Sequence, residues 1–215
     1  MASSDSDVRA DYSDTERQIF DAALQVFARK GKDGARMQEI ADAADINKAM
    51  LHYYFRNKET LYAEVFAFTM RRFRASFGAP LKEAPTFEET LRVFIEGYVE
   101  FVRSNEDAMR LMVNENLAGG TLLGEHLRRM KEAGQAPPQI LVEKIEAAVE
   151  AGEIRPVDPN HTVLSVISTC IFFFVAKPTV REMHLEGESW NAFVEDRKQH
   201  LFDLLYHGLA PRSDA

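Results

Sequence analysis

The chain has 215 residues, 46% of them hydrophobic and 28% charged, with a formal net charge of −8. It is long enough for one large or two small domains with a buried core, and the composition excludes a disordered chain. One cysteine, Cys170, excludes an internal disulfide and fits a reducing cytosol. The longest apolar run, CIFFFVA, is far shorter than the roughly 20 residues of a membrane span. The polar, acidic opening MASSDSDVRADYSD lacks a signal-peptide pattern, so we expect a cytoplasmic protein whose residues 1–12 form a flexible arm.

The first helices follow from apolar periodicity, while strand patterns are nearly absent along the whole chain. Asp14 or Ser13 can cap a helix that continues to about Lys30, where GKDG ends it. A short second helix is expected over 37–44, and Asp45 then occupies a turn. These elements predict an all-α fold.

Two asparagines mark the starts of the next helices, because asparagine is a favoured N-cap residue. Asn47 can cap a short third helix, and Asn57 can cap a fourth, longer helix that ends near Gly78 and Pro80. The stretch GAPLKEAPT is the clearest break in composition and predicts a domain boundary, although the fourth helix bridges the parts on either side of it.

Further helices are expected beyond this break, separated by turn-forming stretches such as AGQAPP and AGEIRPVDPN. Pro178 should kink or interrupt the helix that carries FFFVAKPTV. The expected ranges are 86–103, 106–117, 120–133, 137–151, 159–183 and 188–208.

The charge of the chain is unevenly distributed. From Arg29 to Lys58 there are seven basic side chains against four acidic ones, so this segment is +3 and the remainder −11. A locally positive end on an acidic body can approach a phosphate backbone while the body is repelled, which favours one docking orientation.

The third helix has two chemically different faces when its residues are placed about 100° apart. Leu51 and Phe55 fall on one side, with Tyr54 at its margin. The opposite side carries Lys48, Ala49, His52 and Tyr53. Packed on a preceding helix through a short turn, such a helix is what a helix-turn-helix inserts into a major groove.

Each outward residue suits a contact with DNA. Lys48 can donate to guanine, Ala49 permits a close approach and can touch a thymine methyl, and His52 can bind a base edge or a phosphate. The hydroxyls of Tyr53 and Tyr54, with Lys58, suit phosphate contacts. The alternative is that the aromatic residues are core side chains and Lys48 is a solvated surface lysine, and helical periodicity alone does not separate the two.

The stretch IADAADINKAMLHYYFRNKETL, residues 40–61, resembles the signature of the TetR/AcrR family of transcriptional regulators. The resemblance is specific over residues 13–62 and beyond them rests on length and helix arrangement. It implies a homodimeric repressor with a three-helix helix-turn-helix domain, residues 13–60, and a helical ligand-binding and dimerisation domain, residues 61–212. It also implies a palindromic DNA operator and a small apolar or amphipathic effector that releases it. The DNA-contacting positions that the resemblance implies are Arg36, Gln38, Lys48, Ala49, His52, Tyr53, Tyr54 and Lys58.

Four positions depart from the family pattern. Asp45 stands where glycine is usual, although aspartate can also adopt a left-handed backbone. Arg36 and Met37 begin the second helix in place of threonine or serine, so a neutral cap is lost and Arg36 becomes available for phosphate. His52 replaces the commoner tyrosine, which bears on operator preference.

The rest of the chain supplies candidates for a ligand pocket and for a dimer interface, with ordinary core packing as the alternative for each residue. The pocket candidates are Phe66, Met70, Phe73, Phe94, Tyr98, Phe101, Met109, Met112, Glu115 and His126. The last two long helices resemble the pair that forms a four-helix dimer bundle in the family. The interface candidates are Val166, Cys170, Phe173, Phe174, Phe193, Leu201, Leu204 and Leu205.

Two rival functions are weaker. An enzymatic function is disfavoured because the sequence shows no evident catalytic site: Cys170 lies in an apolar run, and the histidines show no HExxH pattern. His200 and His207 could share a helix face but lack an acidic or cysteine partner, so we expect no metal and no cofactor. A helical adaptor for protein partners would explain the acidic body but would leave Lys48, His52, Tyr53 and Lys58 without a role.

Overall fold

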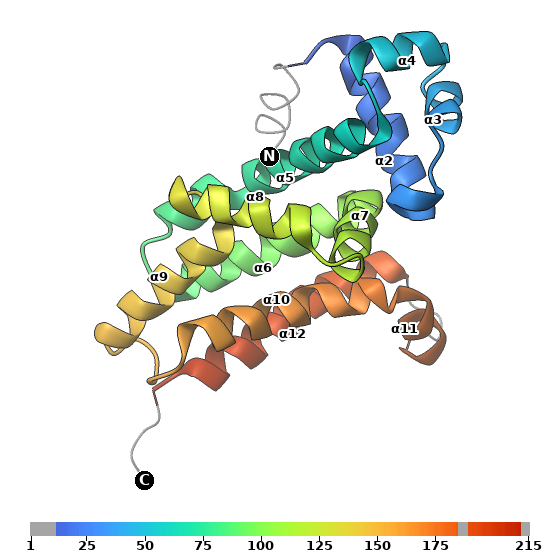
Figure 1. Cartoon of the computed structure of the whole chain (residues 1–215). Coiled ribbons are helices and arrows are strands. Elements are labelled where there is room, and N and C mark those ends of the chain that lie inside the picture. The colour runs from blue at the N-terminus through green and yellow to red at the C-terminus, as the bar shows by residue number, and fades with distance from the viewer. Residues whose placement is uncertain (1–11, 185–188, 212–215) are drawn as a thin grey trace. The chain divides into compact units, whose positions relative to one another are not determined.

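The computed structural model describes residues 12–184 and 189–211, and every regular element within them is a helix (Figure 1). This confirms the predicted all-α class. The expected arm, residues 1–12, lies outside the described residues except for Tyr12. The Tyr12 ring packs edge-on against Phe20 and Phe68, with centroid distances of 5.0 and 5.5 Å.

The helices form two compact units, of which the first comprises described residues 12–76 and 105–132. It contains α2 (Asp14–Gly34), α3 (Met37–Ala43), α4 (Lys48–Tyr54), most of α5 (Lys58–Glu83), α7 (Glu106–Leu117) and α8 (Thr121–Glu132). Helix α2 packs on α3 and α7 through an apolar stripe that includes Ile19, Ala23 and Phe27, all fully buried. The expected limits 13–60 and 61–212 of the two domains stay a prediction.

Helix α2 begins and ends by local rules. The Ser13 hydroxyl accepts from the Glu16 N–H, and the Glu16 carboxylate accepts from the Ser13 N–H at 2.9 Å, which forms a capping box. The regular helix breaks at Gly31, whose φ is 67°, one residue beyond the predicted end. A further helical turn then continues to Gly34.

Helix α5 is longer than predicted. It passes through Pro80 and ends at Glu83, not near Gly78 and Pro80. Phe77 and Leu81 lie on either side of the proline and are 2% and 0% exposed, so burial of these side chains extends the helix by a turn. Proline removes one backbone donor, and tertiary packing here outweighs that loss.

The second unit comprises described residues 77–104, 133–184 and 189–211. It contains the end of α5, α6 (Phe87–Ser104), α9 (Pro137–Glu150), α10 (Pro159–Val175), α11 (Lys177–His184) and α12 (Trp190–Leu209). Helix α6 packs against α9, α10 and α12. The backbone of α6 comes close to α5 at Gly97, where an added Cβ would lie 2.6 Å from Cγ of Phe77.

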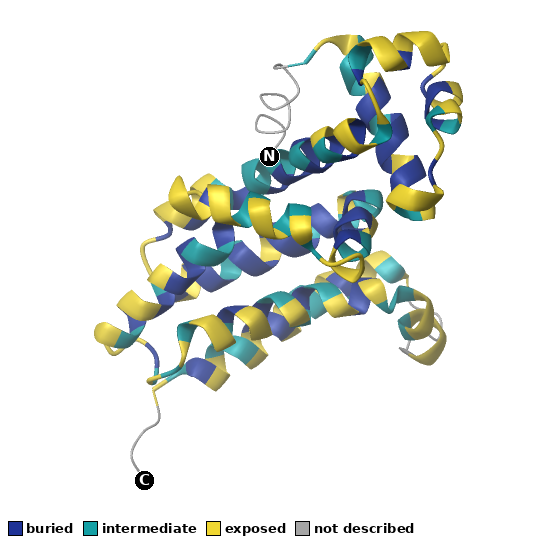
Figure 2. Ribbon diagram, viewed as in Figure 1, coloured by how far each residue is buried: buried dark blue, intermediate teal, exposed yellow. Residues whose placement is uncertain are grey.

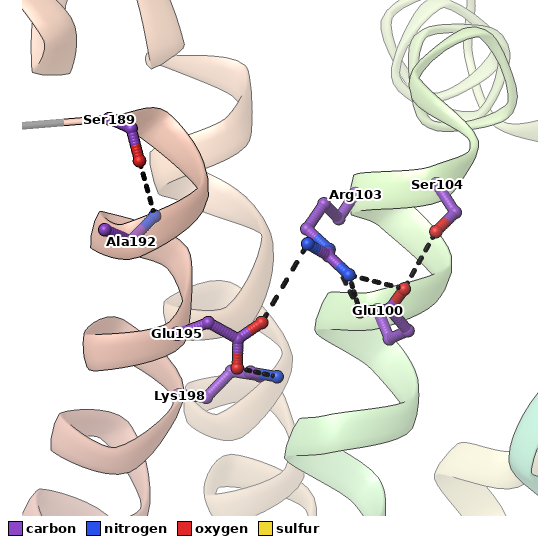
Figure 3. A network of polar contacts seen from close by, with 7 residues as sticks. All are labelled: Glu100, Arg103, Ser104, Ser189, Ala192, Glu195 and Lys198. Carbon is purple, nitrogen blue, oxygen red and sulfur yellow. Dashed lines mark hydrogen bonds and ion pairs between the residues drawn. The ribbon is translucent and has the colours of Figure 1, made fainter.

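Polar contacts join α6 to α12 at the edge of the second unit (Figure 3). Arg103 on α6 pairs with Glu100 at 2.8 Å and reaches Glu195 on α12 at 3.9 Å. Lys198 pairs with the same Glu195 at 2.6 Å. Ser189 accepts from the Ala192 N–H at 3.1 Å and so begins α12. All four charged groups are partly exposed, so these ion pairs contribute little to the stability of the fold and mainly orient the side chains between α6 and α12.

The segment predicted as one helix over 159–183 is two helices. Helix α10 ends at Val175, and α11 begins at Lys177, bent by 74° from it. Pro178, placed in the first turn of α11, accounts for the interruption that the sequence predicted. Among the described residues no single helix is long and apolar enough to cross a membrane. Only α10 and α11 taken together reach the required length and apolar composition, and they are separated by this bend.

Candidate DNA-binding surface and candidate ligand cleft

Helices α3 and α4 are joined by a four-residue turn, Ala44–Asn47, whose geometry is fixed by short contacts. Asp45 adopts a left-handed backbone with φ of 51°. The Gln18 side chain on α2 donates to the Ala44 carbonyl at 2.7 Å and anchors the turn. Asn47 accepts from the Met50 N–H at 2.7 Å and caps α4, as predicted.

The two faces of α4 separate as the sequence indicated (Figure 2). Leu51 is 0% exposed and Phe55 is 6% exposed, so both belong to the core of the first unit. Figure 2 shows much of α4 exposed, and Lys48, Ala49, His52 and Tyr53 lie on that exposed surface. Tyr53 is 86% exposed. A tyrosine with so much exposed surface does not pack in a core, which argues against the alternative that Tyr53 is a core aromatic residue.

The outward cations of this helix are available to a ligand. Among the described residues, neither Lys48 nor the exposed Arg56 just beyond α4 has an ion-pair partner. His52 Nδ1 lies 3.4 Å from the Arg56 carbonyl oxygen. The side chain of Gln38 on α3 is held by Asp42 at 2.7 Å, and Arg36 is exposed at the start of α3.

Arg36 shows the effect of the missing cap. Its side chain makes no capping hydrogen bond, and the Glu39 carboxylate instead accepts from the Arg36 N–H at 3.3 Å. Glu39 also accepts from Lys30 at 2.6 Å, and this hydrogen bond is the main cause of its lowered pKa. Arg36 is exposed at the start of α3, and its side chain is not used as a cap.

Lys58 is bound differently from the other predicted DNA contacts. Its ammonium donates to the carbonyl oxygens of Asp33 and Ala35, at 3.1 and 3.2 Å, and so joins α5 to the end of α2. Tyr54 is half-buried, and its ring packs edge-on against Tyr53 with centroids 5.6 Å apart. The sequence did not single out Arg56, although its charge was part of the local excess that predicted a polyanion.

A cleft of about 930 Å³ opens in the first unit where the ends of α2 and α7 meet the starts of α5 and α8. Tyr62 and Glu115, 2% and 6% exposed, form part of its lining. Tyr62 donates to Glu115 Oε2 at 3.1 Å. Burial, followed by the adjacent Glu115 charge, raises the pKa of Tyr62, so its hydroxyl stays protonated and donates.

The predicted pocket residues are distributed over both units, and nine of the ten are buried. Glu115 lines the cleft. Half-buried His126 on α8 lies edge-on to Phe66, with centroids 6.4 Å apart. Burial, then nearby Arg129, Arg71 and Arg74, lowers the pKa of His126. Phe66, Met70, Phe73, Met109 and Met112 share the first unit, whereas Phe94, Tyr98 and Phe101 on α6 belong to the second. Their role in ligand binding stays a prediction.

The predicted interface residues also divide by exposure. Val166, Cys170, Phe173, Phe174 and Leu201 are at most 5% exposed within one protomer, whereas Phe193 and Leu205 are half-buried and Leu204 is 57% exposed. Burial raises the pKa of the Cys170 thiol to about 12, as expected for a packing side chain rather than a nucleophile. Leu164 and Phe172 on α10, which are 62% and 68% exposed, were not among the predicted interface residues.

Two short helices at a tight turn, the second exposed along one face with unpaired cations, define a helix-turn-helix DNA-binding protein. Residues 19–65 match the bacterial regulatory proteins of the tetR family, and residues 88–205 match the tetracyclin repressor-like C-terminal domain. The chain belongs to the tetR family of bacterial regulatory proteins and is a DNA-binding transcriptional regulator.

Curated relatives agree with this assignment, and a solved structure shares the fold. The chain is 28% identical over 206 residues to the transcriptional regulator RutR of Escherichia coli strain K12, with 92% of this chain and 91% of RutR covered. It is 30% identical over 173 residues to the transcriptional repressor SCO4008 of Streptomyces coelicolor, with 80% and 84% covered. The crystal structure of AibR with isovaleryl coenzyme A and operator DNA has a TM-score of 0.71 at 22% identity, with 92% and 99% covered.

Proposed function

We propose that the protein binds a palindromic operator with one copy of α4 in each of two successive major grooves, and that a small apolar or amphipathic molecule releases it. The exposed, cationic face of α4 carries this proposal, because its opposite face is fixed in the core by Leu51 and Phe55. Two-fold symmetry of a dimer supplies the second half-site contact. Acting on DNA, the protein works in the cytoplasm.

The residues on this surface divide into two roles. Lys48, Ala49 and His52 read base edges, whereas Arg36, Gln38, Tyr53, Tyr54 and Arg56 contact the phosphate backbone and fix the register. Lys58 contributes by holding the end of α2, because its ammonium already binds two carbonyl groups. Its positive charge still raises the potential of the surface, so its contribution to DNA affinity is indirect.

Dimerisation uses α10 and α12, and we revise the residues expected at the interface. Leu164, Phe172 and Val175 on α10 are 62%, 68% and 46% exposed, and Leu204 on α12 is 57% exposed. Exposed apolar side chains of this size mark an interaction surface. The buried members of the predicted set, such as Cys170 and Leu201, support that surface from within the protomer.

Release follows from linkage between the two bound states. The effector binds more tightly to the DNA-free conformation, because a ligand with equal affinity for both states shifts nothing. Helix α5 begins directly after the helix-turn-helix, and Lys58 ties its first turn to α2. A displacement of α5 therefore changes the spacing of the two recognition helices in the dimer.

The test is binding of the purified protein to duplexes from its own upstream region and to duplexes selected from a random pool, by fluorescence anisotropy across a salt series. We expect specific binding whose log K falls with log salt, with a slope of about −0.9 per phosphate neutralised. The double variant Lys48→Ala, Tyr53→Ala should lose this affinity without losing helicity.

The control is the double variant Lys82→Ala, Leu117→Ala, which alters residues outside the helix-turn-helix. It should bind the selected duplex as the wild type does. If no duplex from either source binds better than random DNA, the operator proposal is wrong and a protein-binding adaptor becomes the better reading.

A further inference from the structure

The Glu115 carboxyl group is unusual because it is buried without a cation. It is 6% exposed, and its two oxygens accept from the Tyr62 hydroxyl at 3.1 Å and from the Leu122 N–H at 2.8 Å. Both of these donors are neutral, and within residues 12–184 and 189–211 Glu115 has no ion pair. Both oxygens act as acceptors, as in an ionised carboxylate.

Such a group is costly in a folded protein. Removing a carboxylate from water without a paired cation carries a desolvation penalty of several kcal/mol, even after the surroundings relax. Leu122 lies in the first turn of α8, so the positive end of that helix offsets about half a charge. Two neutral hydrogen-bond donors and a helix dipole do not replace a paired cation, so a cation placed nearby would be favoured.

The cleft gives a cation a route to this position. It has a volume of about 930 Å³, is open to solvent and has Glu115 and Tyr62 in its lining. Leu117, 82% exposed, lines the same cleft and offers apolar surface for a ligand body.

Among the described residues, no cation on the rim of the cleft forms an ion pair with Glu115. Arg29, Lys30, Lys32, Asp33 and Glu59 carry both signs. Lys30 is paired with Glu39 at 2.6 Å. The Lys32 ammonium lies 5.8 Å from the centroid of the Tyr62 ring, so this ring already attracts a cation on the protein itself.

We propose that this cleft binds a small organic cation, an ammonium or guanidinium group on an apolar or aromatic body, with its charge at Glu115 and its body against Tyr62 and Leu117. The proposal names the effector class of the regulator and for its regulatory consequence rests on the proposed function. Cation binding itself is independent of DNA. The ligand would connect α7 and α8 to α5, which follows the recognition helix in the chain.

The first experiment uses three probes of one size on the full-length protein at pH 7: 2-phenylethylammonium, neutral 2-phenylethanol and anionic phenylacetate. Isothermal titration calorimetry and ligand-observed NMR give the dissociation constants. The ammonium probe should bind about tenfold or more tightly than either other probe, since a charge-assisted hydrogen bond contributes about 1.5–3 kcal/mol. Equal binding of the three, or no binding of the ammonium probe, overturns the proposal without any variant.

The second experiment locates the site with Glu115→Gln, which keeps two polar atoms at the same place and removes the charge. The variant should lose the preference for the ammonium probe. Glu106→Gln is the matched control on the same helix, because Glu106 lies outside the cleft lining and pairs with Arg110 at 3.8 Å. Circular dichroism verifies that both variants fold. An ammonium preference that survives in Glu115→Gln contradicts the site.

The operator assay separates this inference from the proposed function. If the ammonium probe binds through Glu115 and lowers operator affinity in the wild type, the cleft is the effector site. Glu115-dependent binding with unchanged operator affinity supports the cation site and contradicts only its regulatory role. A protein that binds no operator but binds the probe through Glu115 retains the site while the regulator proposal fails.

Discussion

The Lys58 ammonium donates to the Ala35 carbonyl at 3.2 Å and to the Asp33 carbonyl at 3.1 Å, so one side chain closes the end of α2 against the start of α5. The last carbonyls of a helix have no partner inside the helix, and a lysine near them satisfies the unpaired acceptors. A residue that sequence analysis assigned to phosphate contact therefore has a structural role as well.

This geometry predicts different effects for two lysines of the same surface. Lys58→Met should lower the free energy of unfolding by about 1–2 kcal/mol, because charge-assisted hydrogen bonds to two carbonyls are lost. Lys48→Met, at a residue without an ion pair, should change stability by less than about 0.5 kcal/mol. Urea denaturation measures both values.

The DNA assay should rank the same variants in the opposite order. Lys48→Met is expected to weaken operator binding by about tenfold or more, since a good base contact contributes about 1–3 kcal/mol of discrimination. Lys58→Met should weaken it less at equal folded concentration. A larger loss from Lys58→Met would restore that residue to the direct phosphate contacts.

The turn of the helix-turn-helix provides a second prediction. Asp45 has φ of 51°, a conformation that glycine adopts without steric cost. Asp45→Gly should therefore leave stability unchanged or raise it slightly, whereas Asp45→Ala should lower it by about 1 kcal/mol. Thermal unfolding of the two variants decides between this backbone argument and a role for the carboxylate, which predicts that both variants are equally destabilised.

The sequence predicted the helix-turn-helix well because its determinants are local. Asn47, Leu51 and Phe55 lie within one short segment, and their spacing alone places a cap and a buried face. Glu115 was among the predicted pocket residues, but its hydrogen bond to Tyr62 joins residues 53 positions apart, and no local pattern pairs them. This hydrogen bond could therefore be found only from the folded structure.

The exposed side of α10 could not be predicted from the sequence, for a different physical reason. Helix α10 is apolar nearly all round, so its sequence does not distinguish the face that packs on α6 from the face left outside. Cys170 and Phe173 are inside, whereas Phe172 is exposed. The break at Ala176 was predicted from Pro178, but its 74° bend depends on packing that no local pattern encodes.

Close packing at Gly97 gives a third prediction. A methyl group there would lie 2.6 Å from Phe77 Cγ, so Gly97→Ala should lower the free energy of unfolding by about 1–3 kcal/mol through overpacking. Gly124→Ala on α8 is the control, because nothing lies within 4 Å of its added Cβ. It should raise stability by up to about 1 kcal/mol. Urea denaturation that shows equal effects of both variants would contradict the close approach of α5 and α6.

The exposed faces of α10 and α12 give the last prediction. Leu204→Glu and Phe172→Glu should convert the dimer to monomer and abolish tight operator binding, because a buried charge in an apolar interface costs several kcal/mol. Each side chain is more than half exposed within the protomer, so the monomer should stay folded. Sedimentation velocity and circular dichroism measure the two properties.

Leu117→Glu is the matched control for that experiment, since Leu117 is 82% exposed on α7, outside α10 and α12. It should remain a dimer at the same concentration. If Leu204→Glu and Phe172→Glu also remain dimers, the exposed faces of α10 and α12 do not form the interface. The originally expected residues Phe193 and Leu205, both half-buried on α12, are then the next to be substituted, because they are the members of that set a second protomer can still reach.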